Sequence, residues 1–264
     1  MNDFHVHSDF SSDAEHSMES IVTAAVMQGL TEICITDHVD YDYADPSIDF
    51  DVDHPAYVAE IERLRLKFSG QIQIRHGLEI GLQPQILERC SKLVQEQKPD
   101  FVLGSMHTCG RQDLYRGDYY RSRTPRQAWE NYLSELISMT AIYTDYSVLG
   151  HLDILRRYDE ATAEYPIEPF KDLFMELFAN VIHNDKGIEV NTSGIRGHLN
   201  SPLPSYDILR WYHEAGGKIL TLGSDSHGPD CLSANFQEVI EQLKAIGFKH
   251  YCSFVDMKPV FNTL

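Results

Sequence analysis

Seven short, mostly apolar runs of this chain end in side chains that can bind a metal or exchange protons. The runs cover residues 3–7, 32–38, 72–81, 101–107, 147–153, 187–194 and 219–227. Amphipathic stretches with helical spacing separate them, at residues 19–28, 56–68, 85–97, 125–143, 168–184, 205–215 and 236–246. Strands that alternate with helices in this way predict a parallel β-sheet with helices packed outside it.

The polar residues favour a barrel over an open, doubly wound sheet. They close run after run at its carboxyl end, as His38, Glu79, His107, His151, Asn191, Asp225 and His227. In (β/α) barrels all strand ends converge on one mouth, which holds the active site. Seven strands in place of eight would make the barrel irregular. No linker or break in composition divides the chain, so we expect one catalytic domain over residues 1–264.

Charge and cysteine usage restrict the partners and the compartment. The chain has 22 Lys and Arg against 40 Asp and Glu, a net charge of −18. Nucleic acid and anionic membrane surfaces would be repelled, and neither is expected as a partner. The five cysteines are scattered without a C-x-x-C pair, and no signal-peptide pattern or membrane-spanning apolar run is found. We therefore expect a reduced, cytoplasmic protein.

The first run has two histidines, His5 and His7, two positions apart. Side chains at that spacing on a strand point to the same side, which suits chelation of one metal ion. Alone, this pair is a weak signal, because surface histidines also occur in pairs. Together with imidazoles and carboxylates at the other strand ends, it predicts a site for two or three divalent ions. Burial of so many ionisable groups without metal or mutual pairing would be costly.

The set "HVHSDFSSD", "TDH", "GLE", "GSMH", "GHLD" and "GSDSH" resembles the polymerase-and-histidinol-phosphatase (PHP) superfamily of metallohydrolases. Within it, the chain is similar to the monofunctional histidinol-phosphate phosphatases, and the likeness extends over all seven runs in order. The resemblance implies a distorted seven-stranded (β/α)7 TIM-like barrel with a trinuclear metal centre.

The resemblance also implies which residues bind each ion. His5, His7, Glu79 and Asp225 would bind the first ion, and Asp13, His38 and His227 the second. The third would share Glu79 and add His107 and His151. Many members of the superfamily have His where this chain has Asp13. The second site is therefore richer in oxygen, which shifts its preference from Zn²⁺ toward Mn²⁺ or Fe²⁺ without excluding zinc.

Arginines near two strand ends are candidates for binding phosphate, because the guanidinium group suits bidentate contact with phosphoryl oxygens. Arg156 and Arg157 follow His151, and of the two we favour Arg156. Arg196 lies in a glycine-flanked turn after the sixth run, where Ser193 could add a hydrogen bond.

Two loops are candidates for contact with the rest of the substrate. An acidic loop follows His38, and Asp42 and Asp45 are its carboxylates nearest to that residue. We expect them to attract the ammonium and imidazole of a cationic amino-alcohol phosphate, although a solvated loop is the simpler interpretation. The segment 111–127, rich in Arg and Tyr, is either a substrate-covering loop or ordinary surface.

The expected function is hydrolysis of L-histidinol phosphate to L-histidinol and phosphate, a step of histidine biosynthesis. A hydroxide bridging the metal ions would attack phosphorus in line. The named substrate depends on the resemblance alone. One alternative is a PHP-type phosphodiesterase or exonuclease that acts on nucleotides or short oligonucleotides. A second is a non-catalytic PHP binding module, which an intact ligand set makes less attractive.

Overall fold

The computed structural model describes residues 1–264 and contains the seven predicted strands in one sheet. In sheet order they are β1 (Asn2–Asp3), β2 (Glu32–Ile35), β4 (Gln73–Gly81), β5 (Phe101–Ser105), β8 (Val148–Leu149), β9 (Gly187–Asn191) and β10 (Leu220–Gly223). Every neighbouring pair is parallel. The order along the sheet follows the order along the chain, as expected for successive (β/α) units.

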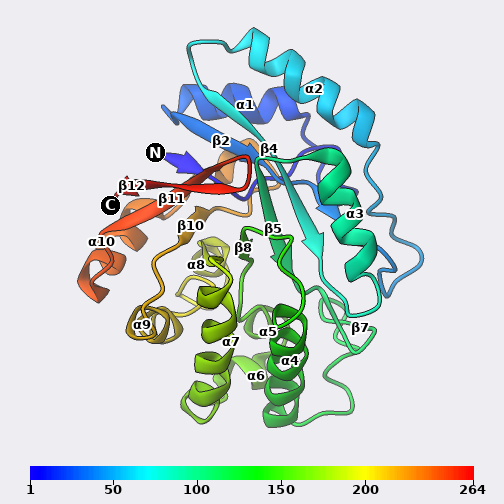
Figure 1. Cartoon of the computed structure of the whole chain (residues 1–264), viewed down its shortest axis with the longest axis vertical. Helices are drawn as coiled ribbons and strands as arrows, with labels where there is room; N and C mark the ends of the chain where they lie inside the picture. The colour runs from blue at the N-terminus through cyan, green and yellow to red at the C-terminus, as the bar shows by residue number, and fades with distance from the viewer.

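Backbone hydrogen bonds bring the last strand back to the first. The Phe4 amide donates to Leu222 O at 3.0 Å, and the Asp225 amide donates to His5 O at 2.8 Å. The next bond runs from the His7 amide to Ser226 O at 2.9 Å. The sheet is therefore a nearly closed barrel (Figure 1), which confirms the predicted fold class.

The main helices lie outside the barrel, close to their predicted positions (Figure 1). They are α1 (Met18–Met27), α2 (His54–Lys67), α3 (Leu87–Gln97), α4 (Pro125–Thr140), α7 (Lys171–His183), α9 (Tyr206–Glu214) and α10 (Phe236–Ile246). Short helices are α5 (Leu155–Tyr158), α6 (Glu160–Glu164) and α8 (Ser193–Arg196), with 3₁₀ turns η1 (Glu168–Phe170) and η2 (Pro229–Cys231).

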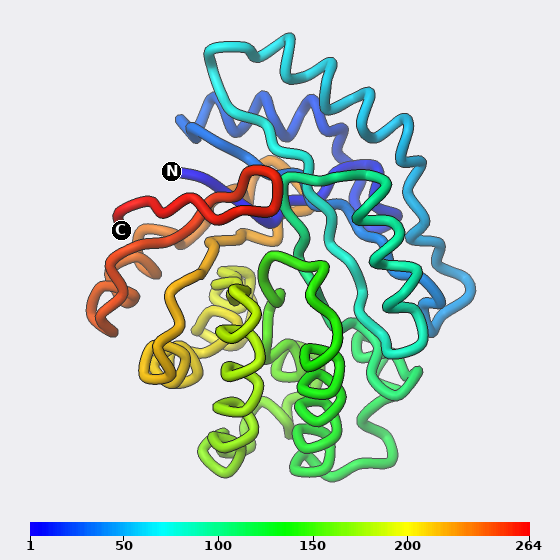
Figure 2. The backbone as a smooth tube through the Cα atoms, viewed as in Figure 1, coloured from blue at the N-terminus to red at the C-terminus, as the bar shows by residue number.

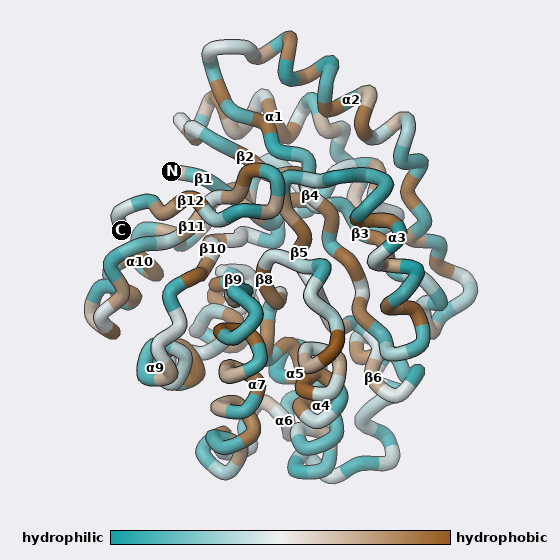
Figure 3. Tube along the Cα trace, in the orientation of Figure 1, coloured by the Kyte–Doolittle hydropathy of each residue, from teal (hydrophilic) through white to brown (hydrophobic).

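The amphipathic pattern of the helices produces the core. Apolar residues alternate with polar ones along each helix in Figure 3, and one cluster of 63 buried apolar residues joins the helices to the barrel. Local signals set the helix starts: Thr124 and Gln127 form a reciprocal capping box before α4. None of the helices combines the length and the apolar character that a membrane crossing requires.

Two hairpins were not expected from the sequence. The small one pairs β6 (Thr108–Cys109) with β7 (Gln112–Asp113), next to the barrel mouth. The larger one pairs β11 (His250–Val255) with β12 (Lys258–Thr263) and lies close to the amino terminus (Figure 2). Its Phe254 packs 5.2 Å from the ring of Phe101, the first residue of β5. The hairpin thus covers the amino end of the barrel and leaves the carboxyl end open for a site.

The strand that positions His38 is interrupted. Strand β2 pairs with β4 up to Ile35 opposite His76, and β3 (His38–Val39) resumes in the same register with His38 opposite Glu79. At the interruption the Tyr57 hydroxyl, from α2, lies 2.9 Å from Ile35 O and 3.0 Å from Gly77 O. Tyr57 is fully buried, so its hydroxyl is the hydrogen-bond donor for carbonyls that water cannot reach.

We predict that Tyr57→Phe lowers the free energy of unfolding by about 1–3 kcal/mol, because it removes a buried hydroxyl that donates to carbonyl groups water cannot reach. Chemical denaturation of the wild type and the variant measures the difference. Tyr165→Phe, at a half-buried tyrosine whose hydroxyl has no hydrogen-bond partner, is the control and should change stability by less than about 0.5 kcal/mol. Equal effects of the two substitutions would contradict the role given to Tyr57.

Candidate metal centre

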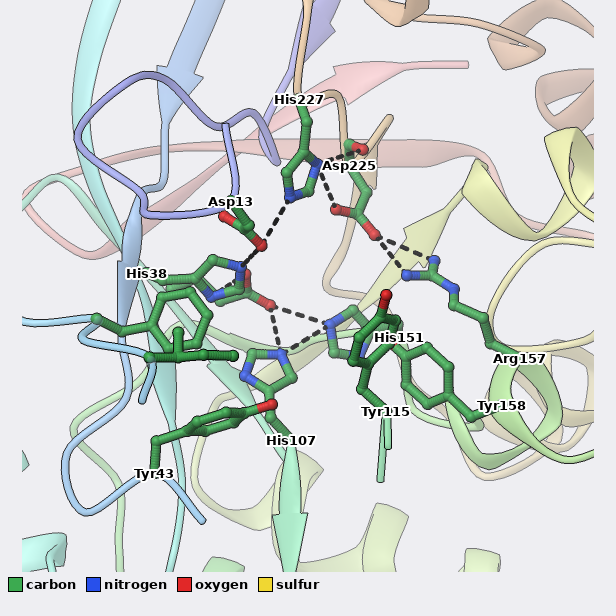
Figure 4. Close-up of a pocket in the computed structure, with 13 residues that line it drawn as sticks. Asp13, His38, Tyr43, His107, Tyr115, His151, Arg157, Tyr158, Asp225 and His227 are labelled. Carbon is green, nitrogen blue, oxygen red and sulfur yellow. Dashed lines mark hydrogen bonds and ion pairs between the residues drawn. The ribbon is translucent and has the colours of Figure 1, made fainter. Parts of the chain in front are cut away.

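All nine residues predicted as metal ligands lie together at the carboxyl end of the barrel. His5 and His7 follow β1, His38 lies on β3, Glu79 lies on β4, and His107, His151, Asp225 and His227 follow β5, β8 and β10. Asp13 comes from the loop between β1 and α1. Seven of the nine line one cavity of about 360 Å³ (Figure 4), and His5 and His7 are fully buried behind its wall.

The Glu79 carboxylate is at the centre of this group and is fully buried. Its Oε2 atom lies 3.1 Å from His5 Nε2, 3.3 Å from His7 Nε2 and 3.2 Å from His38 Nδ1. Its Oε1 atom lies 3.0 Å from His151 Nε2 and 3.3 Å from His107 Nε2. One carboxylate therefore faces histidines from four different strands or strand ends. One of its oxygens faces His5, His7 and His38, and the other faces His107 and His151.

A second carboxylate, Asp13, faces the outer histidines. Its Oδ2 atom lies 3.3 Å from His227 Nε2 and 3.5 Å from His38 Nε2. The His7 ring lies between those two imidazoles, with ring centres 4.4 Å from His38 and 4.3 Å from His227. Asp13 is the most exposed carboxylate of the set, with 42% of its side chain accessible. This part of the centre is therefore open to the cavity.

The pKa values of these groups respond to burial and to each other. Burial lowers the pKa of His38, but Glu79, Asp13 and Asp40 outweigh it and raise that pKa to about 10. Burial and the nearby His227 and His38 lower the pKa of His7 to about 3. Burial raises the pKa of Glu79, but the surrounding histidines overcome this effect and hold it well below its usual range. The carboxylates in the cavity wall thus require positive charge close by.

The donor atoms fit divalent metal ions. The Nε2 atoms of His5 and His7 lie 3.0 Å apart, and both also face Glu79 and Asp225 oxygens. His38 Nδ1 lies 3.2 Å from Glu79 and is buried, yet it makes no aligned hydrogen bond. Nitrogen and oxygen atoms that converge in this way leave their lone pairs to be shared by a cation, and imidazole with carboxylate is a donor set for Zn, Mn or Fe.

Four overlapping groups of donors are compact enough to hold an ion, with their atoms within 4.8 Å of one another. They are His5–His7–Asp225, His5–Glu79–His151, His38–Glu79–His107 and His7–His38–His227. Shared members join the groups into one continuous centre. They also join residues that the sequence resemblance assigned to different ions, such as His7 with His38 and His227.

Buried polar residues behind the histidines were missed at the sequence level. Asp40 Oδ1 lies 2.8 Å from His107 Nδ1, and Glu189 Oε1 lies 2.6 Å from His5 Nδ1. Ser105 donates to Glu79 Oε1 at 2.6 Å. Such partners orient ligating imidazoles. For Glu189 a signal was present, because a charged residue inside the apolar run "GIEVN" requires a buried partner.

The arginines differ in their placement. Arg157 lines the cavity and makes an ion pair with Asp225 Oδ2 at 3.0 Å (Figure 4). Arg156, the residue favoured from the sequence, does not line it. Its Nη1 atom is 2.9 Å from the buried Asp153 and 3.3 Å from Ser201, because the start of α5 turns the two adjacent side chains apart.

Two residues in the turn after β9, Ser193 and Arg196, form hydrogen bonds with Asp225. Ser193 hydrogen bonds to Asp225 Oδ2 at 3.2 Å and also contacts Arg157. Arg196 Nη2 donates to the Ser224 carbonyl at 2.7 Å and to the Asp225 carbonyl at 3.3 Å. Neither Ser193 nor Arg196 lines the cavity itself. Ser193 therefore holds the carboxylate of Asp225, and Arg196 holds its backbone, which has a positive φ of 53°.

The acidic loop contributes aromatic side chains, and not its predicted carboxylates, to the cavity. Asp42 is exposed, and Asp45 forms an ion pair with Arg116, so neither lines the wall. Tyr43, Ile48 and Phe50 of this loop do line it, opposite Tyr115 and Tyr158. The Tyr43 hydroxyl donates to Asp113 of β7 at 3.0 Å, which ties the acidic loop to the Arg- and Tyr-rich segment.

Comparison with known proteins agrees with the barrel fold and the set of metal-binding side chains. The model of the PHP domain family matches residues 3–193, and the chain belongs to this family. The matched region ends before Asp225 and His227, which the barrel brings back to the same centre.

Relatives match over nearly the whole chain. A histidinol-phosphatase of Lactococcus lactis is 31% identical over 260 residues, 97% of this chain and 95% of the relative. A probable histidinol-phosphatase of Thermotoga maritima is 27% identical and covers 95% of this chain and 94% of its own length. The crystal structure of the Lactococcus lactis histidinol phosphate phosphatase, in complex with Zn, L-histidinol and phosphate, has a TM-score of 0.91, with 29% identity and 98% of both chains covered.

We predict that the metal-free chain loses stability as the pH rises from 7 to 8.5. Histidines of the unfolded chain lose their protons near pH 6.5, whereas folded His38 keeps its proton up to a pKa of about 10. The folded state therefore binds more protons in this window, and the free energy of unfolding should fall by at least about 1 kcal/mol per pH unit, since the pKa values of His5 and His107 are raised as well.

Urea unfolding of chelator-treated protein at both pH values tests this expectation. His38→Gln should reduce the slope, and His250→Gln, at an exposed histidine, should leave it unchanged. Metal-loaded protein should also show a flatter slope, because coordinated imidazole is neutral. A metal-free wild type that is equally stable at both pH values would contradict the electrostatics described here.

Proposed function

We propose that this protein is a metal-dependent phosphomonoesterase that hydrolyses L-histidinol phosphate to L-histidinol and phosphate, in histidine biosynthesis. The observation that supports it most strongly is the likeness, over 98% of both chains, to a phosphatase whose structure holds Zn, L-histidinol and phosphate. In this chain, the carboxyl end of the barrel has a cavity lined by imidazoles, carboxylates and one arginine.

We infer that the centre holds three divalent ions, Mn, Fe or Zn. His5, His7, Glu79 and Asp225 would hold the first, Asp13, His38 and His227 the second, and Glu79, His107 and His151 the third. The compact donor groups support this division in part, because His5, His7 and Asp225 form one of them, whereas the other three groups each combine residues assigned to different ions. When bound, such ions supply Lewis acidity, an activated water and positive charge for a phosphoryl group.

Arg157 is our proposed phosphate-binding residue, in place of Arg156. Its guanidinium group lies at the cavity wall, where two of its nitrogens are 3.0 and 3.1 Å from Asp225 Oδ2. That ion pair orients the planar group, and its remaining N–H donors are available to phosphoryl oxygens. Ser193 and Arg196 are proposed to act at one remove, by holding Asp225 and its backbone.

The aromatic wall is the proposed seat of the alcohol part of the substrate. Tyr43, Tyr115 and Tyr158 line the cavity on the side away from Asp13 and His227 (Figure 4), and Phe50 lines it beside His38, with ring centres 4.9 Å apart. Imidazole and ammonium groups bind well against aromatic faces. Asp42 and Asp45 lie outside the cavity wall, so any contribution from them is limited to the field at its mouth.

We further propose that residues 1–264 act as one catalytic domain in the cytoplasm. One core of 63 buried residues joins the helices to the barrel, and a second cluster of 7 packs the β11 strand against β5. All five cysteines are free thiols, and four of them are buried, which suits a reducing compartment.

We predict that Arg157→Lys lowers kcat/KM for histidinol phosphate by about 10–100-fold, because lysine cannot bind Asp225 and phosphate through one planar fork. The matched Arg156→Lys should stay within about 3-fold of the wild type, since lysine can keep the ion pair with Asp153. Phosphate release measures both.

Nucleoside 3′,5′-bisphosphate and a short oligonucleotide are the comparison substrates in the same assay. We expect little turnover of either. A loss confined to Arg156→Lys would return the phosphate role to Arg156. Faster turnover of the nucleotides than of histidinol phosphate would contradict the proposed substrate.

A further inference from the structure

One buried carboxylate of the barrel interior, Glu189 on β9, belongs to none of the compact donor groups. It is fully buried and has no Lys or Arg partner. Its Oε1 atom lies 2.6 Å from His5 Nδ1, and its Oε2 atom accepts the backbone N–H of His151 at 2.8 Å and the side-chain amide of Asn191 at 3.2 Å. Both oxygens are therefore engaged: Oε2 accepts two N–H groups, and Oε1 faces a ring nitrogen of His5.

The two nitrogens of His5 face different surroundings. Nε2 points into the centre, 3.1 Å from Glu79 Oε2 and 3.6 Å from Asp225 Oδ1. Nδ1 points outward, to Glu189 Oε1 at 2.6 Å and, at the longer distance of 3.4 Å, to the side-chain nitrogen of Asn191. A neutral imidazole carries its proton on one nitrogen, and a hydrogen bond at one nitrogen decides whether the other is free to bind a metal.

We propose that Glu189 is the positioning residue that holds His5 in its Nδ1–H tautomer and so keeps the Nε2 lone pair directed at the metal centre. This inference rests on the proposed function, because it needs the centre to bind metal. Glu189 does not touch the metal or substrate in this account. It acts through His5 on one side of the barrel and through the backbone of His151 on the other.

The packing around Glu189 keeps the carboxylate in place. A Cβ atom at Gly223, on the neighbouring strand β10, would lie 2.1 Å from Glu189 Oε1 and 2.6 Å from His5 Cβ. Only glycine at position 223 leaves room for the Glu189–His5 contact. Glu189 also lies beside Asn191 on the same face of β9, so the two side chains brace each other.

An amide at position 189 tests the tautomer directly, because neither of its orientations satisfies all partners. With the amide oxygen toward His5, the NH₂ group would face the N–H donors of His151 and Asn191. With the NH₂ group toward His5, the amide would favour the Nε2–H tautomer, which has no lone pair for the metal. Glu189→Gln therefore changes the hydrogen-bond polarity at almost constant volume.

The experiment compares the wild type, Glu189→Gln and the control Asp100→Asn. Asp100 is a carboxylate near the amino end of the barrel that accepts from the His76 amide and pairs with Arg65, far from the donor groups. Each protein is stripped with a chelator and titrated with Zn²⁺ against a chromophoric competitor, and unfolding is followed by circular dichroism. We expect Glu189→Gln to bind one Zn²⁺ per chain about 10–100-fold more weakly, and Asp100→Asn to bind as the wild type does.

Nitrogen-15 NMR of Zn-loaded wild type, with His5 assigned through its loss in His5→Gln, reads the tautomer without any variant at position 189. A protonated Nδ1 with a metal-shifted Nε2, and an Nδ1 proton shifted downfield as a short hydrogen bond to the Glu189 carboxylate requires, supports the proposal and decides the matter if Glu189→Gln does not fold. A protonated Nε2, or Zn²⁺ affinities unchanged in folded Glu189→Gln, would overturn the role of Glu189 alone. A wild type that binds none of Zn²⁺, Mn²⁺ and Fe²⁺ would overturn the proposed function and this inference together.

Discussion

The Glu79 carboxylate is the interaction on which the rest of the site depends. It is fully buried, and five imidazole nitrogens lie within 3.3 Å of its two oxygens, from His5, His7, His38, His107 and His151. An anion buried in this way is tolerated only if positive charge or hydrogen-bond donors surround it. The histidines around Glu79 in turn need protons or metal ions between them. Metal ions meet both requirements at once.

The fold provides this arrangement through strand register. His38 stands opposite Glu79 because β2 and β3 keep one register across their interruption, and Tyr57 satisfies the carbonyls there. The hydrogen bonds that return β10 to β1 place Asp225 beside His5. Outer carboxylates complete the arrangement, since Asp40 and Glu189 each face the Nδ1 atom of an inward-pointing histidine. The site thus has a charged inner group and a second anionic layer that orients it.

The sequence was sufficient for the barrel and for the convergence of the strand-end residues, whereas Asp13, a loop residue, was predicted only through the family resemblance. The spacing of apolar residues and the polar residues at strand ends are local signals in the sequence. The strand ends converge because the parallel sheet closes into a barrel. Arg156 and Arg157 show the limit of such signals. Adjacent residues on a short helix diverge by about 100°, and the direction of each depends on partners far along the chain, Asp153 with Ser201 for one and Asp225 for the other.

The same limit explains the loops and the hairpins. Asp42 and Asp45 were chosen for their charge, but Asp45 is paired with Arg116 and the loop turns Tyr43 and Phe50 toward the cavity. The β11–β12 hairpin has an irregular pattern, and its place at the amino end of the barrel follows from packing of Phe254 on Phe101. Such tertiary contacts leave no periodic trace in the sequence.

The most direct test of the account is the metal content of Glu79→Gln, measured together with its hydrolysis of histidinol phosphate. Glutamine keeps the volume of Glu79 but removes the charge shared by the surrounding histidines. We expect the wild type to retain three divalent ions per chain, and the folded variant to lose at least one ion and about 100-fold or more in kcat/KM. A folded Glu79→Gln protein with wild-type metal content and wild-type turnover would contradict the central role of this carboxylate.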